Sequence, residues 1–415
     1  MKIYRKLSRM AVRVAIVLMS LISAGLIPLP PLVPAAYADT VRAEIGNPLQ
    51  AAQELIKQQK YQEALVKIQE ADAVANKTPY ETFVLEQMRG SAAAGTGDID
   101  TAARAFDAVI TSGRLSKDDQ LKILLAVSGS YYRAKEYPKA IDWAQRYQEA
   151  GGSDPSLGVL TLQSYYLNGD YANAAREAQS QIAVEEKSGS TPSEEQLQIL
   201  ASCYLKQNDS AGYISALEKL VTWYPKKDYW ADLLARVQRQ PGFSDRLTLD
   251  MYRLMLATGN LDVASDYMDM AQLALQAGYP REAQKVLEQG YTVKALGSGV
   301  EAPRQKRLKD LADHQTATDQ MTLASDAQGA AGRDDNAMVN VGYDLVINGR
   351  ADQGIALMEQ GIAKGELKHP DEERLLLGIA YVQSGNHSKA VQVLKVVEGS
   401  DGAAKLAELW TIEAK

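Results

Sequence analysis

Residues that build reactive or covalently linked sites are scarce in this chain of 415 residues, which has one cysteine and three histidines. A single cysteine excludes an internal disulfide, so packing alone has to stabilise the fold. The histidines His314, His369 and His387 are widely separated and match no metal-ligand spacing. Phosphate-loop, zinc-protease and serine-hydrolase motifs are also absent from the sequence. We therefore expect no catalytic site, no bound metal and no cofactor.

A hydrophobic run long enough to cross a bilayer is also missing near the N-terminus. Val14 to Ile27 is a largely apolar stretch of 14 residues, whereas a spanning helix needs about 20. Five Lys and Arg side chains precede this stretch, and Ala36-Tyr37-Ala38 supplies a small-residue cleavage site after it. This predicts a signal peptide over residues 1–38, cleavage after Ala38 and a periplasmic protein that does not span the membrane. An N-terminal membrane anchor facing the periplasm is the alternative.

The excess of charge is acidic. The chain has 45 basic and 52 acidic side chains, and the predicted leader holds 5 basic ones, so 40 − 52 leaves −12 after cleavage. Such a surface repels nucleic acid, which is not an expected partner. The one dense basic run is interpreted as a solvated helix face, with nucleic-acid or lipid contact as the alternative. It comprises Arg304, Lys306, Arg307 and Lys309.

Tyrosine supplies most of the aromatic surface, with 21 Tyr beside 3 Phe and 4 Trp. Apolar residues are 46% and charged residues 23% of the chain, a composition typical of globular proteins. Each packed tyrosine has to keep its hydroxyl near water or a polar partner. A thin array of helix pairs meets that requirement better than one thick core, because each residue lies near a surface.

Two segments, Ser130–Ala140 and Ser164–Ala174, repeat one pattern 34 residues apart. In each, a helix ends on paired tyrosines, a short polar turn follows, and a second helix opens with Tyr-x-x-Ala. Thirty-four residues is the period of the tetratricopeptide helix–turn–helix unit. The same small residue recurs at Ala64, Ala102, Ala140, Ala174, Ala283, Gly354 and Ala390.

With this recurrence, the chain resembles an exported bacterial tetratricopeptide-repeat protein over roughly residues 45 to 415. The clearest copy, Leu377-Gly378-Ile379-Ala380-Tyr381, matches the L-G-x-x-Y pattern. Related helix-pair repeats, of the Sel1 or outer-membrane-assembly type, are the near alternatives. The resemblance implies an all-α fold, a right-handed α-solenoid of tandem helix hairpins. A final helix, Ala403 to Ala414, is expected to cap the last apolar face.

The spacing predicts three regions after the leader: repeats over 39–225, degenerate helical repeats over 226–335, and repeats with the capping helix over 336–415. The first repeat is expected to begin after Gly46-Asn47-Pro48. Tyr213 stands where the small residue is expected in a weaker copy, and the steps from it to Ala283 (70 residues) and from Ala283 to Gly354 (71 residues) are each expected to hide a degenerate helix pair. One such pair is expected to span Trp230 to Leu256, and the other Lys306 to Ala330.

Register places one row of residues on the concave side formed by the first helices of successive repeats. These groove candidates are Leu125, Tyr132, Val159, Gln163, Tyr166, Gln198, Ser202 and Leu205. Tyrosine gives stacking area and a hydroxyl at low entropic cost, as binding hot spots require. The alternative is that Tyr132 and Tyr166 only pack between neighbouring repeats. The Lys and Asn clamp of chaperone-binding relatives is not found at these places, which favours an extended or helical peptide as ligand.

Four isolated features are interpreted as structural. Cys203 is expected to be a buried, inert thiol, with a redox-active thiol as the alternative. His387 is expected to be a half-buried packing residue. Asp334-Asp335-Asn336 is expected to form a solvated helix N-cap ahead of Ala337, with a cation site as the alternative. Gly297-Ser298-Gly299 is expected to be a loop between helices.

We therefore predict a non-catalytic adaptor of the bacterial cell envelope, which binds a segment of a partner protein in its groove. The alternative is a scaffold subunit of an envelope enzyme, of a polysaccharide-export assembly or of a TonB-linked transport assembly. Self-association of the chain through weak or terminal faces is a further prediction.

Overall fold

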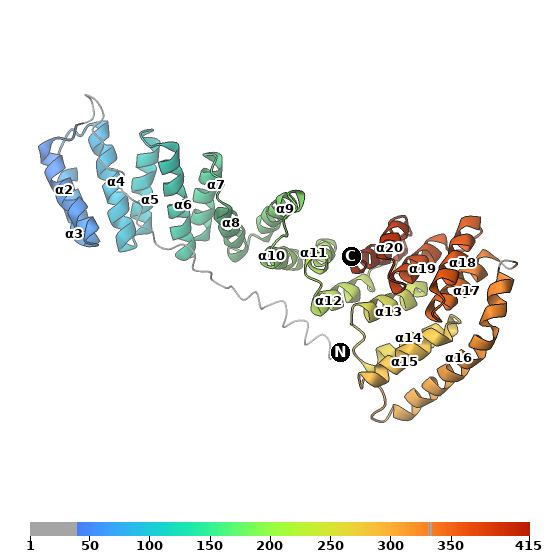
Figure 1. The fold of residues 1–415 in the computed structure, drawn as a ribbon. Coiled ribbons are helices and arrows are strands. Elements are labelled where there is room, and N and C mark those ends of the chain that lie inside the picture. The colour runs from blue at the N-terminus through green and yellow to red at the C-terminus, as the bar shows by residue number, and fades with distance from the viewer. Residues whose placement is uncertain (1–39, 331, 333) are drawn as a thin grey trace. The chain divides into compact units, whose positions relative to one another are not determined.

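The computed structural model describes residues 40–330, 332 and 334–415, so the predicted signal peptide lies outside the described residues. These residues form twenty α-helices and one short 3-10 turn, with no strand among them (Figure 1). The predicted all-α fold of tandem helix hairpins is confirmed. Contacts divide the chain between Asp209 and Ser210 into two compact units, called unit 1 and unit 2 below.

Unit 1 is a run of helices in which each helix packs on the next along the chain. Its helices are α2 (Ala43–Lys57), α3 (Tyr61–Asp72), α4 (Pro79–Thr96), α5 (Ile99–Thr111), α6 (Lys117–Arg133), α7 (Tyr137–Glu149), α8 (Pro155–Leu167), α9 (Tyr171–Lys187) and α10 (Glu194–Lys206). Two apolar clusters fill it, one from α2 to α4 and one from α4 to α8. The recurring alanines Ala64, Ala140 and Ala174 are fully buried, as the close approach of paired helices requires.

The first repeat begins earlier than predicted. Helix α2 starts at Ala43 and includes Pro48 as its sixth residue. Buried Ile45 and Leu49 extend the apolar face by a turn, which outweighs the single backbone hydrogen bond that proline cannot donate.

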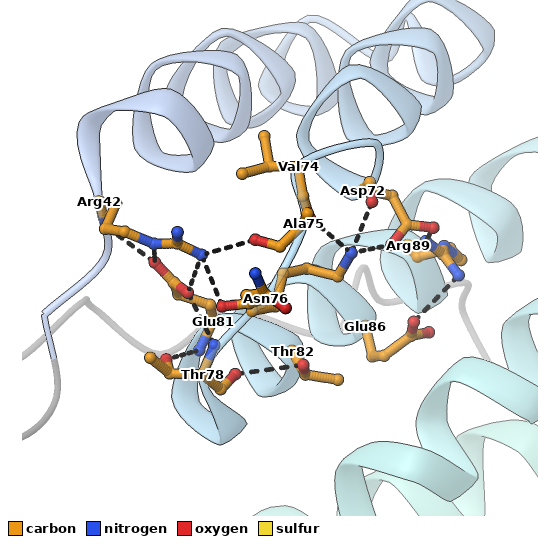
Figure 2. A network of polar contacts seen from close by, with 11 residues as sticks. Arg42, Asp72, Val74, Ala75, Asn76, Thr78, Glu81, Thr82, Glu86 and Arg89 are labelled. Carbon is orange, nitrogen blue, oxygen red and sulfur yellow. Dashed lines mark hydrogen bonds and ion pairs between the residues drawn. The ribbon is translucent and has the colours of Figure 1, made fainter.

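A polar network fixes the N-terminal end of unit 1 (Figure 2). Glu81 is fully buried and closes a capping box with Thr78 at the start of α4. The Arg42 side chain donates to both Glu81 carboxylate oxygens, at 2.8 and 2.9 Å, and also to the carbonyl oxygen of Asn76 at 3.0 Å. The Arg42 hydrogen bonds are the largest cause that lowers the pKa of Glu81, to about 2. Arg42 therefore ties the start of α2 to the loop before α4.

Unit 2 also runs from helix to helix, with less regular pairs. Its elements are α11 (Ser210–Trp223), α12 (Lys227–Val237), the 3-10 turn η1 (Asp245–Leu247), α13 (Thr248–Ala257), α14 (Ala264–Gln276), α15 (Pro280–Thr292), α16 (Ala302–Ala330), α17 (Asp335–Ile347), α18 (Ala351–Lys364), α19 (Pro370–Gln383), α20 (His387–Leu394) and α21 (Ala403–Glu413). Consecutive helices α12 and α13 lie in the first predicted gap, where a pair was expected.

The prediction of a helix pair over Lys306 to Ala330 is wrong. One helix of 29 residues, α16, occupies that stretch. No glycine or proline occurs between Pro303 and Gly329 to end it. Ion pairs one turn apart support its polar face, Lys306 with Asp310 at 2.7 Å and Lys309 with Asp313 at 2.6 Å. The basic run thus belongs to a largely solvated helix face, as predicted.

Helices α17 and α18 cross at unusually short range because two glycines face each other. A Cβ atom added to Gly354 would lie 2.3 Å from the carbonyl oxygen of Gly342, and one added to Gly342 would lie 2.7 Å from that of Gly354. Gly354 stands at the recurring small position of the repeat. Here even alanine is too large, which explains glycine at this copy.

The terminal helix α21 packs on α19 and α20, as the capping prediction requires, and it also contacts α11 and α13. Two ion pairs join these distant parts of unit 2. Lys405 lies 2.7 Å from Glu218 of α11, and Arg246 of η1 lies 3.0 Å from Asp401 in the loop before α21. The last helix of unit 2 is therefore fixed against its first helices as well as the last repeat.

Three structural interpretations are settled by the described residues. Asp334 caps α17, because its Oδ1 accepts from the Ala337 N–H at 2.7 Å. Residues 297–299 form the loop between α15 and α16. The prediction for His387 is wrong. It is the first residue of α20 and exposed, because the packing contact falls on fully buried Ala390 one turn later.

Among the described helices, none has the length and apolar character needed to span a bilayer.

Candidate functional site

The paired tyrosines of unit 1 divide two structural tasks between them. The first tyrosine of each copy reaches back to the second helix of the preceding repeat. The Tyr131 hydroxyl donates to Asp100 of α5 at 2.9 Å. Tyr165 accepts from Gln145 of α7 at 3.0 Å, and Tyr204 accepts from Gln179 of α9 at 2.5 Å. These three tyrosines therefore stabilise the contact between repeats.

The second tyrosine of each pair reaches forward to the first helix of the next repeat. The Tyr132 hydroxyl lies 2.6 Å from Gln163 Oε1 on α8, and the Tyr166 hydroxyl lies 2.8 Å from Ser202 Oγ on α10. Each ring also packs edge-on against the tyrosine that opens the following helix, with ring centroids 5.9 Å apart for Tyr132 and 5.6 Å for Tyr166. The register predicted from the 34-residue period thus brings these four residues together.

A carboxylate that the prediction missed extends this row. The Gln163 side-chain amide donates to Glu195 Oε1 on α10 at 2.9 Å. Tyr132, Gln163 and Glu195 therefore form one chain of hydrogen bonds across three successive repeats. Because all three side chains are only half-buried, they stay accessible to a ligand. We call this surface the α6–α8–α10 face; its residues are Leu125, Tyr132, Val159, Gln163, Tyr166, Glu195, Gln198, Ser202 and Leu205.

The other predicted groove residues differ in exposure. Leu125 is half-buried and packs on the neighbouring apolar cluster. Val159 is 42% exposed, more than is usual for a large apolar side chain. Gln198 and Leu205 are half-buried, and Gln198 donates to Glu194 at 3.4 Å. The face therefore offers accessible apolar surface together with side-chain amides and hydroxyls.

For Tyr132 and Tyr166 the structure shows the packing role, while the binding role stays a prediction. The tyrosines do pack between repeats, as the alternative states, yet neither is buried. Burial raises the pKa of Tyr132, and the negative charge of Glu195 acts in the same direction. The hydroxyl of Tyr132 therefore stays protonated and keeps its hydrogen bond to Gln163.

Cys203 lies behind this face and is fully buried. Burial raises the pKa of its thiol to about 12. Thiolates, not thiols, carry cysteine reactivity. The structure therefore confirms the predicted burial of the thiol.

Unit 2 has a buried ionic cluster of its own. Arg253 on α13 is 4% exposed and lies 2.7 Å from both Asp250 and Glu282. Its guanidinium carbon stands 4.5 Å from the ring centroid of Tyr343. Its charge is compensated inside the unit, so we assign the cluster to the fold. In the described part of the chain, no group of three or more His, Cys, Asp or Glu side chains is arranged to hold a metal ion.

Residues 88–155 match the family described as tetratricopeptide repeat. The matched stretch includes the second half of α4, then α5, α6 and α7, and thus part of the α6–α8–α10 face. The match supports a tetratricopeptide-repeat protein. Such repeats are generally non-catalytic interaction scaffolds.

No curated protein matches this chain. Among solved structures, the tetratricopeptide-repeat domain of P58(IPK) is 12% identical, covering 88% of this chain and 97% of that one, with a TM-score of 0.23. The structure of Naa15/Naa10 bound to HypK-THB is 10% identical, covering 86% of this chain and 68% of that one, with a TM-score of 0.26. The Cut9-Hcn1 hetero-tetramer of the APC/C is 12% identical over 88% and 83%, with a TM-score of 0.18. Such scores establish no shared arrangement of the repeats.

Proposed function

We propose that this protein is a non-catalytic adaptor that binds a segment of a partner protein on its α6–α8–α10 face. The observation that carries the proposal is the row of half-exposed tyrosine, amide and carboxylate side chains on three successive first helices. Tyrosine and the neighbouring apolar residues supply contact area, and the amides and hydroxyls fix a peptide backbone.

The row is already ordered by its own hydrogen bonds. Tyr132 is held by Gln163 and by the ring of Tyr137, and Tyr166 by Ser202 and Tyr171. A ligand that binds here loses little entropy in immobilising these side chains, because hydrogen bonds and ring contacts already restrain them. Pre-ordered aromatic surface of this kind is suited to recognition of a short segment.

The proposed compartment is the periplasm, and the partner is a protein of the cell envelope. Support for this comes from the leader-like sequence of residues 1–38, which lies outside the described residues. Cleavage after Ala38 would leave a short segment ahead of Arg42, the residue that fixes the start of α2. Sequencing the N-terminus of the protein from a cell-envelope fraction tests this; a protein that starts at Met1 would contradict cleavage.

The binding face is tested by affinity capture from an envelope extract. The test variant carries Tyr132→Ala and Tyr166→Ala. The matched control carries Tyr165→Ala and Tyr204→Ala, which removes two half-buried tyrosines from the same array that point toward second helices instead. We expect the first pair to reduce recovery of the specific partner at least tenfold, a loss of about 1.4 kcal/mol or more, and the control pair to retain it.

Circular dichroism at the capture temperature verifies that both variants remain folded. Equal capture by the wild type and by the Tyr132/Tyr166 variant would refute the assignment of this face.

A further inference from the structure

We propose that the α6–α8–α10 face recognises a lysine or arginine side chain of its partner, and that Glu195, Gln163 and Tyr132 form the subsite for it. This inference rests on the proposed function, because it specifies the chemistry of the segment that binds there.

The evidence begins with an arrangement that recurs elsewhere in the fold. In unit 1, the Tyr131 hydroxyl donates to Asp100 at 2.9 Å, and Lys139 lies 2.7 Å from the same carboxylate. The Lys139 ammonium also stands 5.2 Å from the centre of the Tyr131 ring. Tyrosine, carboxylate and cation thus form a closed triad.

Unit 2 holds three more triads of this composition. Tyr381 donates to Glu359, and Lys389 lies 4.0 Å from Glu359 and 5.3 Å from the Tyr381 ring. In the second triad, Arg236 lies 2.8 Å from Asp232 and 4.2 Å from the centre of the Tyr213 ring. In the third, Arg253 lies 2.7 Å from Glu282 and 4.5 Å from the centre of the Tyr343 ring. In both of these triads the tyrosine hydroxyl donates to the carboxylate.

The physical reason for the recurrence is electrostatic. A tyrosine hydroxyl donates one hydrogen bond to a carboxylate and leaves other lone pairs of that carboxylate open. A cation placed beside them gains both the charge pair and the negative face of the ring. A tyrosine close to a carboxylate is therefore a preformed site for Lys or Arg.

The Tyr132, Gln163 and Glu195 row has two of these three components. Its carboxylate is held by the Gln163 amide at 2.9 Å, and the amide oxygen accepts from Tyr132 at 2.6 Å. Glu195 lies near enough to Tyr132 for its charge to raise the pKa of that hydroxyl. No Lys or Arg of the described residues forms an ion pair with Glu195.

The missing component is a cation, and the face is accessible, so a partner can supply it. Glu195 is half-buried, and a charge pair formed there is less screened by water than one at a fully exposed position. The acidic balance of the protein adds a long-range attraction for a basic segment. The charge of this subsite is thus negative, opposite to that of a clamp that holds a carboxylate.

The test uses a phage-displayed library of random dodecapeptides, selected on the full chain. Selected peptides are first sorted by whether Tyr132→Ala/Tyr166→Ala abolishes their binding. The tyrosine-dependent set is expected to carry Lys or Arg at one fixed position. Glu195→Gln retains an acceptor for Gln163 and removes only the charge, so it should weaken these peptides about tenfold. Replacing the basic residue of the peptide with Gln should reduce its affinity for the wild type by the same factor. Combining this replacement with Glu195→Gln should reduce the affinity little further.

A reversed pair strengthens the design. Glu195→Lys should reject the selected peptide and bind its variant with Glu in place of the cation.

Three results have distinct meanings. The inference is supported if the tyrosine-dependent peptides carry a basic residue at one fixed position and bind the Glu195→Gln variant more weakly than the wild type. Tyrosine-dependent peptides without a basic position, or with one that Glu195→Gln leaves unchanged, overturn it and leave the proposed face intact. If no selected peptide depends on Tyr132 and Tyr166, both the inference and the proposed function fail.

Discussion

Two carboxyl groups meet between α16 and α17, and they make the stability of unit 2 depend on pH. Asp344 is 6% exposed and lies against Asp319. Burial, and then the charge of Asp319, raises the pKa of Asp344 to about 7; burial also raises the pKa of Asp319. Below about pH 7 the two carboxyl groups therefore share one proton, and near neutral pH this proton begins to dissociate.

The sign follows from linkage. The folded state binds this proton more tightly than the unfolded chain, whose aspartates titrate near pH 4. The stabilisation is therefore complete below about pH 4 and is lost as the pH rises through about 7. A shift from 3.8 to about 7 sets an upper bound of about 4 kcal/mol, and screening at the half-buried Asp319 reduces our expectation to about 2 kcal/mol.

The perturbation is Asp344→Asn, which fixes a neutral side chain at this position. Urea unfolding at pH 5 and pH 8, followed by circular dichroism, measures its effect on the free energy of unfolding. We expect the variant to gain about 2 kcal/mol relative to the wild type on going from pH 5 to pH 8. Asp352→Asn, which removes an exposed carboxylate from the neighbouring helix α18, should show no such gain. An identical difference between Asp344→Asn and the wild type at both pH values would refute the shared-proton account.

Three further predictions concern packing. The Cys203 thiol, whose pKa burial raises to about 12, should react with a thiol reagent at pH 8 at least about 100-fold more slowly in the folded protein than in urea; equal rates would show that it is accessible. Gly354→Ala should lose about 2 kcal/mol of unfolding free energy because its Cβ would meet the Gly342 carbonyl oxygen. As its control, Gly46→Ala inside α2 should be neutral or stabilising by about 0.5 kcal/mol, since that Cβ would lie 3.7 Å from its nearest neighbour atom; equal losses in both would disprove the close crossing. Glu282→Gln should cost about 3 kcal/mol, because it removes the buried carboxylate that accepts two hydrogen bonds from Arg253; a cost below about 1 kcal/mol would mean that the pair contributes little.

Periodicity predicted the parts of the fold that depend on neighbours along the chain. A fixed period sets which positions of successive repeats lie in one row, so the common row of Tyr132, Gln163, Tyr166 and Ser202 followed from register alone. The buried alanines and the capping role of Asp334 followed from local steric and hydrogen-bonding preferences. These features needed no knowledge of contacts between distant segments.

Features that depend on distant contacts escaped the same reasoning. The length of α16 was missed because its polar composition gives no apolar period and only the absence of glycine and proline marks it as continuous. Glu195 was missed because it lies one turn before the predicted row and carries no motif. The contacts of α21 with α11 and α13 join segments that no repeat period relates.

Site-specific photo-crosslinking in growing cells tests the central claim most directly. A crosslinking amino acid at Gln163, in the middle of the α6–α8–α10 face, should yield a discrete covalent adduct with a partner protein. The same amino acid at exposed Ser180 on the second helix α9 should yield none. An adduct from Ser180 with none from Gln163 would place the binding surface on the other side of the array and contradict the account.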